Sequence, residues 1–167
     1  MFDKKLTNTV HRIQKACRER KIKITTAESC TGGLVAAALT EVPGSSDVLD
    51  RGFVTYSNAA KHEMLGVPVI TLTRYGAVSR QTASAMAKGA LARSMADIAV
   101  AITGIAGPGG GTAKKPIGLV HFYAIARDGR RIRREMHFGK LGRGKVRMRS
   151  VREALAMLEL LAAGGGI

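Results

Sequence analysis

The chain has 167 residues, a length typical of one domain that can bury a substantial core. Hydrophobic residues make up 46% of it, which excludes a disordered chain, and no apolar run approaches the ~20 residues that a membrane helix needs. Lysine and arginine number 27 against 12 acidic residues, and the resulting net charge of +15 favours anionic ligands over cationic ones.

Cysteine and histidine are sparse and scattered. Cys17 and Cys30 are the only cysteines, and the four histidines include no pair three or four positions apart. We therefore expect free thiols, no bound metal and no cofactor. The N-terminus carries charged residues instead of the apolar core of a signal peptide, so the sequence predicts a cytoplasmic protein without a membrane segment.

The spacing of apolar residues predicts alternating helices and strands. In chain order these are a helix at 3–20, a strand at 22–27, a helix from Leu34 to about Val42, a strand at 48–56, a helix at 58–65, a helix at 80–95, a strand at 98–102, two strands at 117–126 and 131–138, and a helix at 145–163. The run at 98–102 is wholly apolar and reads as a central strand buried on both faces. Asp128-Gly129 marks a hairpin between the last two strands.

This order of elements predicts an α/β fold. The late hairpin favours a mixed, mostly parallel sheet, arranged as a three-layer α/β/α sandwich. No repeat and no shift of composition marks a boundary, so we expect a single domain over residues 1–167.

The segment Thr26–Gly33 joins a strand to a helix through paired glycines. Such an elbow exposes the hydroxyl of Ser29, and the unpaired N–H groups of the next helix would face the same space, which suits an anion or a developing oxyanion. The alternative is that Ser29 or Thr31 only caps the helix.

Two further loops follow strands, where ligands bind in α/β folds. One is Tyr56–Lys61. The other is Thr103–Thr112, which has five glycines but neither the spacing of a P-loop nor that of a dinucleotide fingerprint. Taken alone, that glycine-rich loop is equally compatible with a flexible connector.

These segments together resemble one family, the C-terminal domain of the competence/damage-inducible CinA proteins, the nicotinamide mononucleotide deamidases. The matching motifs cover about residues 5–160 in the family's order and are TAESCTGG from Thr26, Tyr56-Ser57-Asn58 with Lys61, Leu65-Gly66-Val67, Gly76-Ala77-Val78-Ser79, Thr103–Pro108 with Gly110-Gly111-Thr112, Lys115-Pro116 and Gly118. The resemblance implies hydrolysis of nicotinamide mononucleotide to nicotinate mononucleotide and ammonia, in pyridine nucleotide salvage.

The resemblance also implies roles for particular residues. Ser29 is expected to be the nucleophile, Lys61 the general base, and Tyr56 a residue that orients or relays the proton. The other expected substrate contacts are Thr31, Gly32, Gly33, Thr103, Gly104, Ala106, Gly107 and Arg143. The family commonly has Gly-Asp-Arg where this chain has Leu141-Gly142-Arg143, so the Asp before the arginine is missing.

The residues themselves support and limit these roles. No histidine lies in the three loops, and Lys61 is the only base in the loops next to Ser29. A lysine serves as a base when it is held desolvated and neutral. The alternatives are that Lys61 is a solvated lysine on a helix surface, that Tyr56 is a half-buried strand aromatic, and that Cys30 replaces Ser29 as nucleophile.

The basic residues crowd the last third of the chain. They are Arg127, Arg130, Arg131, Arg133, Arg134, Lys140, Arg143, Lys145, Arg147, Arg149 and Arg152. This patch leaves nucleic-acid binding open as an alternative function, although aromatic residues are only 4% of the chain and no nucleic-acid-binding motif is present. A solvated face that attracts an anionic nucleotide is the simpler interpretation. A catalytically silent nucleotide sensor is a third alternative, and we expect a homo-oligomer, most simply a dimer.

Overall fold

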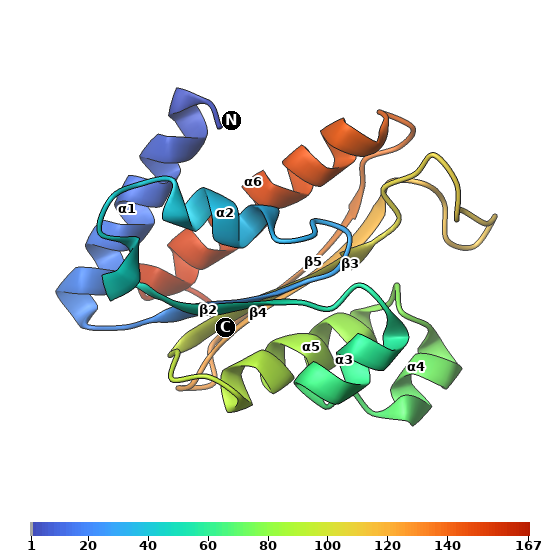
Figure 1. Cartoon of the computed structure of the whole chain (residues 1–167), viewed down its shortest axis with the longest axis horizontal. Coiled ribbons are helices and arrows are strands. Elements are labelled where there is room, and N and C mark those ends of the chain that lie inside the picture. Colours follow the sequence, from blue (N-terminus) through green and yellow to red (C-terminus); the bar gives the residue numbers. More distant parts are fainter. Residues whose placement is uncertain (1) are drawn as a thin grey trace.

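The computed structural model describes residues 2–167. Its five strands form one sheet in the order β2-β1-β3-β4-β5, with helices on both faces (Figure 1). The elements are α1 (Lys4–Arg20), β1 (Ile24–Glu28), α2 (Leu34–Thr40), a 3₁₀ turn (Ser45–Asp47), β2 (Leu49–Val54), α3 (Asn58–Leu65), α4 (Val69–Tyr75), α5 (Arg80–Ala92), β3 (Ile98–Gly104), β4 (Leu119–Ala126), β5 (Arg131–His137) and α6 (Arg143–Ala162).

The predicted three-layer α/β/α sandwich is confirmed. Helices α1, α2 and α6 cover one face of the sheet, and α3, α4 and α5 cover the other (Figure 1). Each layer has its own core: Ile13, Val100 and Leu158 belong to the first, and Met86 and Ala101 to the second. Val100 and Ala101 are neighbours on β3, so this strand supplies apolar side chains to both faces, as its wholly apolar sequence predicted.

The sheet is mixed, as predicted, but it is not mostly parallel. Strand β1 pairs in parallel with β2 and β3, whereas β3–β4 and β4–β5 are antiparallel. The predicted hairpin at Asp128-Gly129 accounts for one antiparallel pair. The other arises because the glycine-rich loop turns the chain back beside β3 without a crossover helix.

Local capping explains why several helices begin and end where predicted. Asp3 accepts a hydrogen bond from Leu6 N at the start of α1, and Ser57 accepts one from Ala60 N at the start of α3. Gly66, at φ 65°, ends α3. Helix α4 lies between two predicted helices and had not been anticipated from the sequence.

The carboxyl ends of β1 and β3 lie side by side in the middle of the sheet. The backbone N–H of Ser29 donates to Ile102 O at 3.0 Å, and Thr55 N donates to Glu28 O at 2.8 Å. The loops that follow β1, β2 and β3 are therefore anchored at one edge of the sheet, where ligands bind in α/β folds. Within residues 2–167, the structure contains no helix with the length and apolar character needed to cross a bilayer.

Candidate active site

Ser29 and Lys61 meet beyond the end of β1. Lys61 Nζ lies 3.0 Å from Ser29 Oγ and donates to the carbonyl of Thr55 at 2.8 Å. Ser29 is on the elbow after β1, and Lys61 is on the first turn of α3, which the Ser57 cap fixes at its start. The elbow and the loop after β2, separate in sequence, thus bring a hydroxyl and an amine into direct contact.

Lys61 is not a solvated surface lysine. Only 1% of the residue is exposed, and no carboxylate within residues 2–167 forms an ion pair with it. Burial disfavours the ammonium form and lowers the pKa of Lys61 from 10.5 to about 8. The Thr55 carbonyl fixes one N–H of the neutral amine, so its lone pair can accept the proton of Ser29.

Cys30 is poorly suited to act as the nucleophile. Its side chain lies in the core on the α6 side of the sheet, and the residue is 6% exposed. Burial raises the pKa of the thiol to about 11, so the reactive thiolate is scarce at neutral pH. Of the two candidate nucleophiles in the elbow, only Ser29 is in contact with a base.

The first turn of α2 does not offer free N–H groups, contrary to the expectation from the sequence. The buried carboxylate of Glu28 accepts hydrogen bonds from Gly33 N, Val35 N and Ala36 N at 2.9–3.0 Å. A fourth contact comes from Thr26 Oγ1 at 3.3 Å. Glu28 therefore caps α2 from the preceding strand, and neither Ser29 nor Thr31 does so.

Donors for an oxyanion remain in the elbow itself. Gly32 N donates to Ser29 O, and Gly33 N to Glu28, so these two amides are used within the protein. The N–H groups of Cys30 and Thr31 have no acceptor anywhere in the described chain. They directly follow the nucleophile candidate, which is where an oxyanion hole needs them.

Two buried hydroxyls beside the dyad also lack a partner. Among the residues that the structure describes, Thr31 Oγ1 and Thr55 Oγ1 are the buried side-chain polar atoms without a hydrogen bond. Unmet hydrogen-bonding capacity of this kind is rare in protein interiors. Its concentration next to Ser29 and Lys61 indicates a site that is completed by a bound molecule or water.

Tyr56 and Arg143 form a second, exposed pair at the same edge of the sheet. Tyr56 is 60% exposed, and its hydroxyl accepts a hydrogen bond from Arg143 Nη2 at 2.6 Å. Arg143 Nη1 also donates to the carbonyl of Gly107 at 3.0 Å. No hydrogen bond in residues 2–167 links Tyr56 to Ser29 or Lys61, so its proposed relay role stays a prediction. Arg143 reaches the site without the Asp that the family commonly has before it.

The other expected substrate contacts are mostly inaccessible as side chains. Thr31, Thr103 and Ala106 are at most 3% exposed, and the Thr103 hydroxyl is used to hold Ala77 O at 2.8 Å. A Cβ on Gly104 would lie 2.7 Å from a Val120 side-chain carbon, so this glycine allows close packing of β3 on β4. Thr103, Gly104 and Ala106 can therefore contact a ligand only through their backbone atoms, whereas the Thr31 hydroxyl has no partner within residues 2–167.

Like Gly109, Gly110 and Gly111 farther along the glycine-rich loop, Ala106 and Gly107 near the end of β3 have free backbone N–H groups. Neither has an acceptor in the part of the chain that the structure describes. Arg143 lies next to these two residues, because its guanidinium donates to the carbonyl of Gly107. Since the N–H groups of Gly32 and Gly33 are used within the protein, Ala106, Gly107 and Arg143 are the expected substrate contacts that remain available for a phosphate.

The sequence analysis missed two residues that shape the elbow. Arg147 donates to Cys30 O at 3.1 Å and to Thr31 O at 2.9 Å, which ties the elbow to α6. Glu28 was part of the quoted motif but received no role. Its position at the end of the strand, a few residues before a helix start, was a usable signal, because carboxylates stabilise helix N-termini.

The comparisons with known proteins agree with this geometry. The family model described as "CinA C-terminal domain" matches residues 6–162. The chain belongs to the CinA C-terminal domain family. It is 46% identical over 159 residues to the "Nicotinamide-nucleotide amidohydrolase PncC" of Escherichia coli K12, covering 95% of both chains.

Other relatives differ in length. A "Putative competence-damage inducible protein" of Caldicellulosiruptor bescii is 57% identical over 110 residues, and the match spans 66% of this chain but only 27% of that protein. Among solved structures, the competence/damage inducible protein CihA from Agrobacterium tumefaciens superposes with a TM-score of 0.94 at 54% identity, covering 98% of each chain. The fold of the CinA C-terminal domain thus extends over nearly all of this chain.

Proposed function

We propose that this protein is an amidohydrolase that deamidates nicotinamide mononucleotide to nicotinate mononucleotide and ammonia, as one domain over residues 1–167. The observation that carries the proposal is the direct contact between Ser29 Oγ and Lys61, which is buried and forms no ion pair with a carboxylate within residues 2–167. The similarity to PncC nicotinamide-nucleotide amidohydrolases over most of the chain supports the same substrate class.

The first half of the reaction uses the neutral form of Lys61. Its amine takes the Ser29 proton while Ser29 Oγ attacks the carboxamide carbon, and the N–H groups of Cys30 and Thr31 receive the developing oxyanion. Lys61 then returns this proton to the amide nitrogen. The C–N bond breaks, ammonia leaves, and Ser29 holds the nicotinoyl group as an ester.

The second half repeats the same steps with water. Lys61 takes a proton from water, the hydroxide attacks the ester carbon, and Ser29 Oγ leaves with the proton that Lys61 returns. The product is the pyridine carboxylic acid nucleotide. Arg143 and the N–H groups of Ala106 and Gly107 would hold the phosphate, and Tyr56 would orient the substrate or Arg143 at the site entrance.

The direct test is ammonia release from nicotinamide mononucleotide by the purified protein, with nicotinamide riboside as a control that lacks the phosphate. We expect turnover of the mononucleotide, and unchanged turnover in EDTA, because the dyad supplies both nucleophile and base. Absence of ammonia release, or complete loss of activity in EDTA, would contradict the proposed mechanism.

The alternative functions are less well supported. A silent sensor would not need the Ser29–Lys61 contact. The basic residues that suggested nucleic-acid binding are partly used inside the fold: Arg127, Arg130 and Arg147 all donate to backbone carbonyls. A homodimer and a cytoplasmic location stay predictions, which sedimentation analysis and cell fractionation would check.

A further inference from the structure

A cleft lies between α5 and the β4–β5 hairpin, on the sheet face opposite α6. It consists of three adjoining hollows of about 210, 460 and 390 Å³. Arg80 lines all three, Arg133 lines two, and His121 with Glu135 joins two of them. Together they have the volume of a small-molecule site.

This cleft is separate from the proposed active site. Its walls come from α4, α5, β4, β5 and the loop before β4. None of the lining residues is Ser29, Lys61, Tyr56, Arg143 or a residue of the elbow. A ligand in the cleft would not need to touch the dyad.

Four cations of the cleft are unpaired, unlike most arginines of this protein. Arg12, Arg51 and Arg152 form ion pairs, and Arg127 donates three hydrogen bonds to carbonyls. By contrast, although Lys115 Nζ donates to Tyr75 O at 2.7 Å, four other cations of the cleft have neither an ion pair nor a side-chain hydrogen bond within residues 2–167. They are Arg80, Lys88, Lys114 and Arg133.

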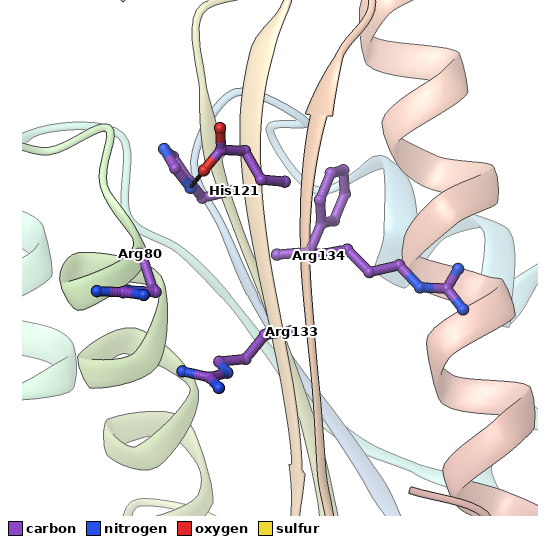
Figure 2. A pocket seen from close by; sticks show the side chains of 6 residues that line it. Arg80, His121, Arg133 and Arg134 are labelled. Atoms are coloured by element: carbon purple, nitrogen blue, oxygen red, sulfur yellow. Dashed lines mark ion pairs between the residues drawn. The ribbon is translucent and has the colours of Figure 1, made fainter. Parts of the chain in front are cut away.

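Figure 2 shows how the charged side chains divide between the two faces of the sheet. Arg133 reaches from β5 toward α5, where Arg80 begins the helix, whereas Arg134 points the other way toward α6. Arg134 is paired there with Glu153. Glu135, the one carboxylate of the cleft, already contacts His121 at 3.5 Å and His137 at 2.8 Å. The cleft thus keeps an excess of positive charge.

The spacing of these cations points to an elongated ligand. Arg80, Ser84 and Lys88 follow one another at four-residue intervals and share one face of α5. At ~1.5 Å per residue, Arg80 and Lys88 are about 12 Å apart along the helix axis. This separation suits a chain of linked phosphates better than a single small anion.

We propose that this cleft binds a small oligophosphate, such as a molecule with a chain of two or more phosphoryl groups, held chiefly by Arg80 and Arg133. Ser84, Gln81 and Thr71 also line the cleft and supply neutral hydrogen-bonding groups for the rest of the ligand. A nucleic-acid duplex fits less well. The reason is that most of the cleft cations lie on two facing walls of the cleft, α5 and β5, and α5 packs directly on β3 and β4.

Isothermal titration with inorganic tripolyphosphate at constant ionic strength tests the proposal. We expect saturable binding at one site per chain, and a loss of affinity of roughly tenfold for each arginine in the double variant Arg80→Ala/Arg133→Ala. The matched control is Lys4→Ala/Arg149→Ala, which removes the same charge from exposed residues of α1 and α6 on the other face of the sheet. This control should bind as tightly as the parent.

Each other outcome overturns the proposal. No saturable binding would mean an ordinary solvated face. Equal loss in both double variants would mean general electrostatic attraction without a discrete site. If duplex DNA binding depends on Arg80 and Arg133 while tripolyphosphate binding does not, this surface is a nucleic-acid interface. We expect both double variants to deamidate nicotinamide mononucleotide at the parent rate, because neither changes a residue of the proposed active site. The binding test and the test of the proposed activity can therefore fail separately.

Discussion

The two polar pairs at the carboxyl edge of the sheet differ in their surroundings. Ser29–Lys61 is buried, and the Thr55 carbonyl holds the lysine, whereas Tyr56–Arg143 is exposed and joins the loop after β2 to the first residue of α6. Burial depresses the pKa of the lysine and suits it to proton transfer. Exposure leaves the arginine charged and free to turn toward a ligand. The buried pair should therefore control kcat, and the exposed pair KM.

Replacement of Ser29 by alanine should have the largest effect. We expect kcat to fall at least about 10⁴-fold, because the covalent step is lost, while ligand binding is retained. Cys30→Ala is the matched control and should keep most of the activity. The reverse pattern, with an active Ser29→Ala and an inactive Cys30→Ala, would move the nucleophile to the thiol.

Replacement of Lys61 should separate activity from stability. Lys61→Met and Lys61→Arg should each lower kcat about 10³-fold or more, because neither accepts a proton at working pH. Burial of an ammonium with a pKa near 8 costs on the order of 3 kcal/mol at pH 7, so Lys61→Met should raise the free energy of unfolding.

The stability gain in Lys61→Met has a defined pH dependence. Unfolded Lys61 binds a proton up to about pH 10.5, and folded Lys61 only up to about 8, so the parent protein gains stability as the pH rises between these values. The difference between Lys61→Met and the parent should be full below pH 8 and vanish above pH 10.5. Urea unfolding at pH 7 and 10.5 measures it. An equal difference at both pH values would mean that folding does not lower the pKa of Lys61.

Glu28→Gln should test whether Glu28 positions the elbow that carries Ser29 or contributes to substrate binding. The amide keeps the shape but accepts the three N–H groups of α2 less well, so the elbow loosens. We expect kcat to fall about tenfold to 100-fold, KM to change less than twofold, and stability to drop by about 1–3 kcal/mol. Glu63→Gln, on the exposed face of α3, is the control. A rise in KM alone would contradict a positioning role.

The pH profile of the parent enzyme should follow the buried base. As Lys61 loses its proton, kcat/KM should rise about tenfold between pH 7 and 9, with an inflection near 8. Steady-state assays at constant ionic strength measure this. A profile that is flat over this range would show that the base titrates elsewhere.

Arg143→Ala should show the effect of the exposed pair. Loss of a charge-assisted contact to the phosphate should raise KM about tenfold and change kcat little. Arg131→Ala, an exposed arginine on β5, should leave KM unchanged at physiological salt. Equal increases in KM for both variants would mean that the basic surface attracts the substrate as a whole.

The sequence predicted the elements that local signals define. The end of α3 was predicted from Gly66 and Pro68, and β3 from its apolar run. Helix α4 was missed because Val69–Tyr75 is rich in β-branched residues, only Leu72 is buried, and the helix therefore lacks an apolar stripe.

The candidate site also contains residues that local sequence signals predict and contacts that they do not. The local segments indicated Ser29 and Lys61, and the family resemblance supplied their roles. The Tyr56–Arg143 contact joins residues far apart in sequence and depends on α6 beginning at the sheet edge, two residues before the predicted start. The paired glycines predicted the elbow, and Gly32 and Gly33 are left-handed there, but the reach of Glu28 over the α2 amides depends on the tertiary path of the chain.

The Glu28 cap has a consequence for how a nucleotide can enter. In many α/β proteins the positive end of the first helix attracts the phosphate, but here the protein's own carboxylate occupies that place. A nucleotide approaching with its phosphate toward the elbow would meet a negative charge, whereas an uncharged carboxamide would not. We therefore expect the buried carboxylate to favour a substrate that enters with its carboxamide toward the elbow, and to disfavour the reversed, unreactive pose.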